Sequence, residues 1–260
     1  MNLLTVEQID VVYGSGNEAN RVVHDFSMTL DRGEIVCLLG PSGCGKTTVL
    51  RAIAGFEPIS AGKILLDDRV LSVRDKMQAP EERHIGMMFQ DYALFPHLTI
   101  EKNIRFGLNK WNKKAATERV EEMLELVCLT KFMKRYPHEL SGGQQQRIGL
   151  ARAIAPQPRL LLLDEAFSNL DVDTRERLAM EVRDILKKNQ LSAILVTHHQ
   201  SEALAMGDRV AWMHRGSLSR WINNHEKQAT LEENQAVATT HRELNPVSMS
   251  DSCPIDWMDA

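Results

Sequence analysis

The sequence Gly40-Pro41-Ser42-Gly43-Cys44-Gly45-Lys46-Thr47-Thr48 decides the fold of this 260-residue chain. It fits the pattern G-x-x-x-x-G-K-[ST], in which backbone N–H groups at the start of a helix converge on a phosphate. The flanks agree, because residues 35–39 predict a buried strand before the loop and residues 46–54 predict a helix after it. We expect the Lys46 ammonium to reach nucleotide phosphates and the Thr47 hydroxyl to reach Mg²⁺.

Short apolar runs recur along the chain and alternate with helical patterns. The further runs cover residues 85–89, 160–163 and 193–196. Strands that alternate with helices favour a mainly parallel sheet with helices on both faces, so we expect an α/β fold. The beginning of the chain differs, because residues 3–11 and 21–30 partly alternate apolar and polar side chains. That pattern predicts an antiparallel hairpin beside the main sheet.

Residues 100–155 contain no convincing strand and read as an all-helical insert. Four apolar side chains in this region recur at the spacing of one helical face: Val120, Met123, Leu124 and Val127. We expect Thr117 or a nearby residue to cap this helix. Pro156 and Pro158 mark the return of the chain to the sheet.

The apolar run 160–163 ends in two acids, Asp164 and Glu165. A buried strand rarely ends in paired carboxylates, because an unpaired buried charge is costly. Next to a phosphate loop, Asp164 is expected to hold Mg²⁺ and Glu165 to orient an attacking water. The alternative is an ordinary strand end with solvated acids.

The composition of the chain limits the classes of protein to which it can belong. Hydrophobic residues make up 43% and charged residues 25% of the chain, as in globular proteins. The formal net charge of −4 argues against general attraction to nucleic acid or anionic lipid. No window approaches 18 consecutive apolar residues, and the first ten residues lack the pattern of a secretory signal. Residues 223–260 are polar and acidic, and we expect them to be weakly ordered.

A longer set of motifs resembles the ATP-binding-cassette (ABC) ATPases over about residues 3–222. The stretch Leu140-Ser141-Gly142-Gly143-Gln144-Gln145-Gln146-Arg147 is similar to the family signature. Four further matches appear in the family's order: Tyr13, Gln90 after the run 85–89, Ser168-Asn169-Leu170-Asp171, and His198. The resemblance implies a P-loop NTPase (RecA-like) core with an antiparallel β subdomain in residues 1–89 and 157–222. It also implies a helical signature subdomain in residues 90–156.

The signature lies at the start of a second helix whose N-terminus suits an anion. A single chain has no use for two such helix N-termini on one nucleotide. The family resolves this with a head-to-tail homodimer that buries two ATP molecules. By resemblance, four signature residues and Asp171 of one chain contact ATP held by the loop of the other chain: Ser141, Gly142, Gly143 and Gln144. The simpler alternatives are a turn with a helix cap at Ser141, and a cap by Asp171 of a helix running to about Lys188.

The resemblance assigns further roles around the nucleotide. Gln90 is expected at the metal and the attacking water, and His198 at the γ-phosphate, which makes the chain an ATPase. Tyr13 is placed to stack on adenine. A strand-end amide at Gln90, a structural histidine at 198 and a packed aromatic at 13 are the alternatives.

Three features favour the ATP-binding subunit of a bacterial importer. Ser141 and Asp164 are 23 residues apart, which leaves no room for a long coiled coil. There is one cassette, and no membrane span is fused to it. The stretch 89–99 is similar to that of binding-protein-dependent importers, so we expect residues 92–97 to dock on a separate permease. The implied partners also include, indirectly, a solute-binding protein, and the expected location is the cytoplasmic face of the inner membrane.

The solute is the least determined expectation. The stretches 55–59, 89–99 and 135–141 look most like those of ferric-iron import ATPases, but polyamine, sulfate and maltose-type ATPases share much of them. A soluble ABC ATPase that remodels a cytosolic complex remains an alternative, and a P-loop kinase would leave the signature unexplained. His199 stands where the family usually has Asp, Ser201 replaces a common acid, and residues 223–260 do not predict the β-rich regulatory domain of these relatives.

Overall fold

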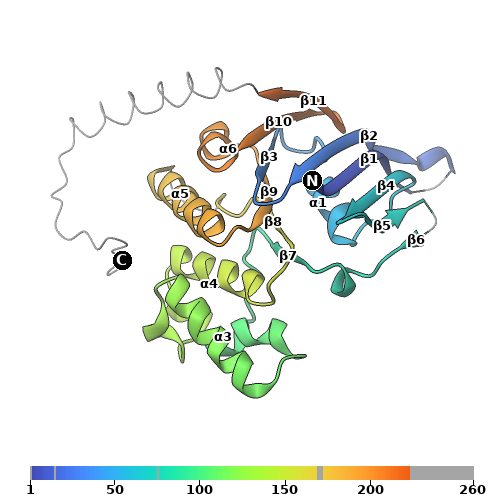
Figure 1. The fold of residues 1–260 in the computed structure, drawn as a ribbon. Helices are drawn as coiled ribbons and strands as arrows, with labels where there is room; N and C mark the ends of the chain where they lie inside the picture. Colours follow the sequence, from blue (N-terminus) through green and yellow to red (C-terminus); the bar gives the residue numbers. More distant parts are fainter. Residues whose placement is uncertain (1, 15, 75, 169–171, 223–260) are drawn as a thin grey trace, which may run out of the picture.

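The computed structural model describes residues 2–222 apart from residues 15, 75 and 169–171. The predictions for Asp171 and for the tail 223–260 therefore lie outside the described residues. Two sheets, a set of covering helices and a helical arm make up the described part (Figure 1).

The main sheet has six strands in the order β11-β10-β3-β9-β8-β7. Their bounds are β3 Ile35–Leu39, β7 Ile85–Met88, β8 Leu160–Asp164, β9 Ser192–Thr197, β10 Arg209–His214 and β11 Ser217–Ile222. All neighbours are parallel except β10 and β11, which form an antiparallel pair. The predicted α/β fold is confirmed, and the four predicted core strands are present within one or two residues of their expected bounds.

A second sheet of five strands has the order β2-β1-β4-β5-β6. The strands are β1 Asn2–Tyr13, β2 Asn20–Asp31, β4 Ala61–Leu66, β5 Arg69–Val73 and β6 Lys76–Met77. β1 and β2 form the predicted antiparallel hairpin. Sequence reasoning did not find β4 to β6, which complete this sheet.

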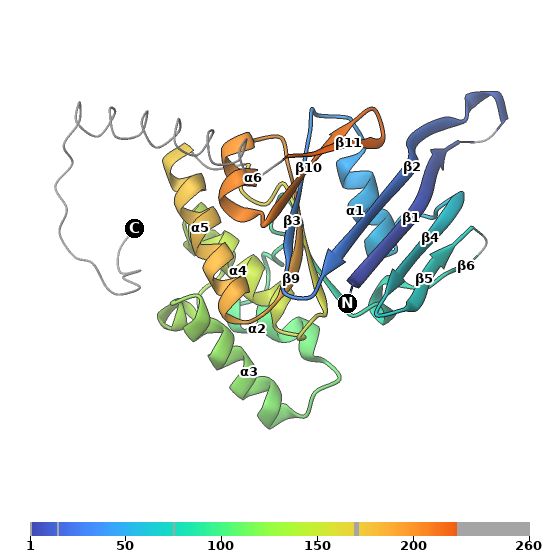
Figure 2. The ribbon, with the colours of Figure 1, turned by 45° about the horizontal axis from the view of Figure 1, so that its top comes forward.

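Helix α1 (Lys46–Ala54) lies between the two sheets, as Figure 2 shows. Alternate residues of β3 divide between two hydrophobic clusters. Val36 and Leu38 pack with α1 and the antiparallel sheet, whereas Ile35 and Cys37 belong to the cluster of the helices on the other face. Helices α5 (Val172–Lys188) and α6 (Gln200–Met206) cover that other face (Figure 2). Apolar side chains on both faces explain the unbroken hydrophobic runs of the strands.

The helical arm contains α2 Ile100–Arg105, α3 Lys113–Leu126 and α4 Gly142–Ile154, below the main sheet in Figure 1. The four side chains predicted to share a face are buried in the cluster of this arm: Val120, Met123, Leu124 and Val127. The cap of α3 was predicted in the wrong place. Asn112 accepts from the Ala115 amide at 2.8 Å, while the Thr117 hydroxyl inside the helix donates to the Lys113 carbonyl at 2.9 Å.

Short 3₁₀ turns complete the described chain, at Gly16–Glu18, Pro80–Glu82, Phe106–Leu108, Thr130–Phe132 and Pro137–Glu139. Within residues 2–222, apart from the gaps given above, no helix combines the length and the apolar character needed to cross a membrane.

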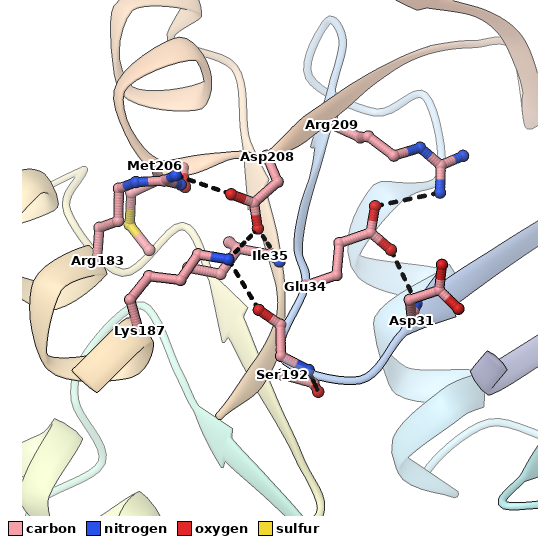
Figure 3. Close-up of polar contacts among 10 residues, drawn as sticks. Asp31, Glu34, Ile35, Arg183, Lys187, Ser192, Met206, Asp208 and Arg209 are labelled. Carbon is pink, nitrogen blue, oxygen red and sulfur yellow. Dashed lines mark hydrogen bonds and ion pairs between the residues drawn. The ribbon is translucent and has the colours of Figure 1, made fainter. Parts of the chain in front are cut away.

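Asp208 ties helix α5 to the start of two strands of the main sheet (Figure 3). Its carboxylate accepts from the Ile35 amide and from Arg183 at 2.8 and 2.7 Å, and it also pairs with Lys187. Burial alone would raise the pKa of Asp208, but the bonds from Lys187, Ile35 and Arg183 outweigh it and hold that pKa below its usual value. The contact therefore stabilises the fold while the carboxyl is ionised.

Asp208→Asn should lower the free energy of unfolding by about 1–3 kcal/mol at neutral pH, because the amide carries no charge for Arg183 and Lys187. A lowered native pKa means that this stabilisation is complete above the usual value of 3.8 and is lost as the pH falls through the native pKa. Urea unfolding at several pH values measures both effects. Asp184→Asn, an exposed acid on the same helix, is the matched control. Equal stability of Asp208→Asn and the parent chain at neutral pH would contradict the assignment.

Candidate functional site

The carboxyl ends of four parallel strands meet at one edge of the main sheet. The register pairs Leu39 with Thr197, Asp164 with Val196, and Met88 with Leu163. The residues that follow these strands are therefore brought together at this edge, where ligands bind in open α/β sheets. They are the phosphate loop after β3, Gln90 after β7, Glu165 after β8 and His198 after β9.

The loop 40–47 has the backbone that an anion cradle needs. Gly43 and Gly45 adopt φ values of 79° and 99°, which other residues rarely adopt, and Gly45 immediately precedes α1. Lys46 is only 4% exposed, and its ammonium donates to the carbonyls of Gly40 at 2.8 Å and Pro41 at 2.9 Å. The loop thus holds its lysine against its own backbone, at the N-terminus of a nine-residue helix.

Neighbouring strands fix the position of this loop. A Cβ on Gly40 would lie 2.2 Å from the Met213 carbonyl of β10, so only glycine fits there. The Gly216 amide, in the turn between β10 and β11, donates to the Cys44 carbonyl at 2.9 Å. Cys44 itself is buried, with its sulfur 3.9 Å from the Lys46 nitrogen. The loop is therefore anchored to the sheet before any ligand binds.

Thr47 and Asp164 bring two oxygen atoms together beside the loop. The Thr47 hydroxyl donates to Asp164 Oδ1 at 2.8 Å. Burial raises the pKa of Asp164, the bond from Thr47 opposes this shift, and the charge of Glu165 adds to it. A hydroxyl and a buried carboxylate side by side are hard oxygen ligands of the kind that Mg²⁺ prefers, and a cation would relieve the cost of ionising Asp164. These residues therefore fit the predicted metal.

Glu165 adopts a left-handed backbone with φ of 47°, which is strained for a side chain of this type. Three hydrogen bonds hold it there. Its amide donates to the Val196 carbonyl at 3.0 Å, and its carbonyl accepts from the Ser168 amide and hydroxyl at 3.1 and 2.9 Å. In this position one carboxylate oxygen, Oε1, lies 3.5 Å from His198 Nδ1.

A buried acid that the sequence did not reveal lies beneath His198. Glu202 of α6 is 1% exposed and accepts from the Thr197 hydroxyl at 2.9 Å. The His199 amide donates in turn to that hydroxyl at 3.0 Å. Burial raises the pKa of Glu202 to about 7, although the Thr197 bond and the charge of Arg175 lower it. Helix α6 has only seven residues, too few for a periodicity to mark an inward acid.

The neighbouring His199 packs against His198, with ring centroids 4.0 Å apart. Burial lowers the pKa of His199, and the positive charges of Arg175 and His198 lower it further. A second histidine here therefore adds little positive charge near neutral pH, although it replaces an acid of the family pattern.

Gln90 and Tyr13 are exposed, at the surface positions that a ligand could reach. Gln90 lies two residues beyond β7. Tyr13 ends β1 and is 38% exposed. Tyr13 is therefore not a core aromatic, and its stacking on adenine stays a prediction.

Ser141 is the cap of α4 in this chain. Its hydroxyl accepts from the Gln144 amide at 3.4 Å, and the Gln144 side chain accepts from the Ser141 amide at 3.0 Å. In the single chain, Ser141 therefore acts as a helix cap, as the simpler alternative predicted. Ser141 and Gly142 are exposed, and α4 lies well apart from α1 in both views (Figures 1 and 2). One chain thus presents two separate helix starts suited to anions.

The predicted docking loop 92–97 is partly packed and partly exposed. Tyr92 and Leu94 pack against the core cluster, whereas Pro96 and His97 are exposed. The Arg152 guanidinium of α4 lies 4.2 Å from the centroid of the Phe95 ring and also donates to the Ala93 carbonyl. Phe106, 56% exposed, lies 4.5 Å from Phe95 between ring centroids. The packing alternative therefore holds for Tyr92 and Leu94, and docking by the exposed residues stays a prediction.

Comparison with known proteins places this site in a family. A model of the ABC transporter family matches residues 23–168. A spermidine/putrescine import ATP-binding protein, PotA of Chromobacterium violaceum, is 44% identical over 92% of this chain and 64% of its own. A putrescine transport ATP-binding protein, PotG of Escherichia coli, is 51% identical over 77% of this chain and 53% of its own.

An Fe(3+) ions import ATP-binding protein, FbpC 2 of Haemophilus influenzae, is 43% identical over 87% of this chain and 65% of its own. The chain therefore spans between about half and two thirds of the length of these relatives.

Solved structures agree on the fold. The ATP-binding cassette MJ0796, solved as a dimer in a post-hydrolysis state with ADP and Pi, has a TM-score of 0.74 and 27% identity. The aligned part covers 85% of this chain and 98% of that one. The cbiO1 protein of Clostridium perfringens shares the fold, with a TM-score of 0.78 over 94% of this chain and 96% of its own, at 22% identity.

Lys46→Ala should weaken ATP binding by more than about tenfold, because it removes the buried ammonium from the phosphate loop. Titration with a fluorescent ATP analogue measures the affinity, and circular dichroism checks the fold. Lys63→Ala, at an exposed lysine paired with Glu7 at 2.9 Å, is the control and should bind like the parent chain. An undiminished affinity in folded Lys46→Ala would show that the nucleotide binds elsewhere.

Proposed function

Because the chain belongs to the ABC transporter family, we propose that it binds and hydrolyses ATP and couples this cycle to solute import through a separate permease. The observation that carries the proposal is the pair of helix starts, at Gly45 and Ser141, in different parts of one chain. A head-to-tail dimer brings the Ser141 region of one chain to the ATP bound at the Lys46 loop of the other. ATP then joins the two chains, and its hydrolysis releases them.

The reaction is mainly one of positioning and charge neutralisation. Lys46 and the loop amides hold the phosphates, and Thr47 and Asp164 would hold Mg²⁺, which would supply positive charge against the phosphates. Glu165 orients the attacking water and accepts its proton, while His198, 3.5 Å from Glu165, contacts the γ-phosphate. Gln90 follows β7, the remaining strand whose carboxyl end meets this edge, and it transmits changes at this site to the loop 92–97.

Coupling to a permease requires a surface on the helical arm. The exposed residues of the loop 92–97, Pro96 and His97, and the exposed ring of Phe106 lie on that surface. Arg152 fastens the same loop to α4, the helix that begins at the signature. Closure of the dimer at Ser141 would therefore move the docking loop together with α4. We therefore propose that the protein works at the cytoplasmic face of the membrane, held there by its permease.

Glu165→Gln should bind ATP, hydrolyse it about 10²–10⁴ times more slowly, and accumulate as an ATP-dependent dimer. The loss of the base stops the step that separates the chains. Phosphate release and light scattering after gel filtration, both with ATP and Mg²⁺, measure the two effects. Glu121→Gln, at an exposed acid of α3, is the control. A Glu165→Gln chain that stays monomeric, with and without its permease, would refute the dimer mechanism.

For the solute we propose a cation, either ferric iron or a polyamine. The sequence favoured iron, and the relatives carry both descriptions, spermidine/putrescine and Fe(3+) import. The cassette does not touch the solute, so the proposal rests on these relatives and on no residue of a solute site.

Vesicles that contain the chain with its co-purified permease should take up one of these cations only when ATP is enclosed. Uptake of labelled ferric iron, putrescine and spermidine, each with its binding protein, measures this, with sulfate and maltose as controls. The Glu165→Gln chain should support no repeated uptake. Transport of sulfate or maltose would overturn the cation proposal, and failure to co-purify with any multi-span protein would favour a soluble remodelling ATPase.

A further inference from the structure

Glu202 is the most deeply buried acid near the site, and no step of the proposed hydrolysis uses it. Its side chain is 1% exposed and points from α6 to the end of β9. Oε2 accepts one hydrogen bond, from Thr197, whereas Oε1 is buried and has no hydrogen-bond partner among the described residues. A buried carboxyl with one oxygen that makes no hydrogen bond lowers the stability of the fold, so the presence of Glu202 here needs a physical explanation.

The Thr197 hydroxyl is the link between Glu202 and the backbone on either side of His198. It donates its proton to Glu202 Oε2 at 2.9 Å and accepts the His199 N–H at 3.0 Å. Because a hydroxyl has one proton, commitment of that proton to Glu202 leaves a lone pair facing the His199 amide. Residues 197 and 199 are thereby both fixed to one buried carboxyl, with His198 between them.

The ring of His199, 4.0 Å from that of His198 between centroids, belongs to the same supported segment, and the other contacts of His198 leave it loosely confined. Its side chain is 36% exposed, and its Nδ1 lies 3.5 Å from Glu165, beyond a firm hydrogen bond. Its backbone position therefore decides where the imidazole points. A displacement of about 1 Å at a reacting group can cost roughly 10²-fold in rate.

We propose that Glu202 is a positioning residue that holds His198 toward the γ-phosphate through the Thr197 hydroxyl and the His199 amide. The inference rests on the proposed function, since it assigns a purpose to the same site. Glu202 accepts the hydrogen bond from Thr197 whether its carboxyl is ionised or protonated, because a proton on Oε1 leaves Oε2 free to accept. With a pKa of about 7, the group therefore keeps the contact across the neutral range.

The test compares two pairs of substitutions in the full chain. Glu202→Met and Thr197→Val remove the contact while keeping the volume of the side chain, and each should lower kcat for ATP hydrolysis roughly tenfold. KM for ATP should change less than about twofold, because the phosphate loop is untouched. Glu202→Gln and Thr197→Ser keep an acceptor and a hydroxyl, and should restore most of kcat. The double variant Thr197→Val/Glu202→Met should be no slower than either single variant.

Ser192→Ala is the matched control, because Ser192 is a buried hydroxyl at the far end of β9 that accepts from the Gly33 amide at 2.8 Å. It should lower the melting temperature and leave kcat unchanged. If Glu202→Met lowered only the melting temperature, as this control does, or if the double variant were about a hundredfold slower, the inference would be wrong.

His198→Ala separates this inference from the proposed function. If His198→Ala is inactive while Glu202→Met hydrolyses ATP normally, only the positioning role fails. If His198→Ala hydrolyses ATP like the parent chain, the role of His198 in the proposed mechanism fails, and the positioning role fails with it.

Discussion

The parallel pairing of β3, β8 and β9 is the constraint on which the site depends. It sets Leu39 beside Thr197 and Asp164 beside Val196, so the phosphate loop, the two acids and His198 emerge at one edge of the sheet. A slip of one residue in any of these strands would turn its side chains to the opposite face. The unbroken apolar runs, packed on both faces by two separate clusters, make such a slip costly. The strand register that packs the core therefore also sets the geometry of the site.

Sequence reasoning succeeded where a local pattern determines a local structure. The strand 35–39 and the helix 46–54 were predicted at their observed bounds, because a run of apolar residues, a glycine turn and an apolar helical face follow one another there. The hairpin of β1 and β2 and the all-helical arm were predicted on the same basis. Motif order further predicted which strand ends would carry site residues, and the register brings those ends together.

Tertiary contacts between distant residues were beyond the sequence. Asp208 meets the Ile35 amide across 173 positions, and no pattern marks either as a partner. Glu202 escaped because α6 has only seven residues, too few to show the period that marks an inward face. Thr117 or a nearby residue was predicted as the cap of α3, but Asn112 occupies the extended conformation that a cap requires, while Thr117 lies inside the helix.

The left-handed backbone at Glu165 means that the residue needed for the chemistry is not the residue that fits this turn with least strain. A glycine or an asparagine would adopt that conformation with less strain, by an amount on the order of 1 kcal/mol. Selection for a sturdier fold alone would therefore drift toward those residues, and only the need for a carboxylate at this turn holds the glutamate in place. The residue after the aspartate of β8 is therefore a position where the side chain best for folding and the side chain needed for the proposed hydrolysis differ.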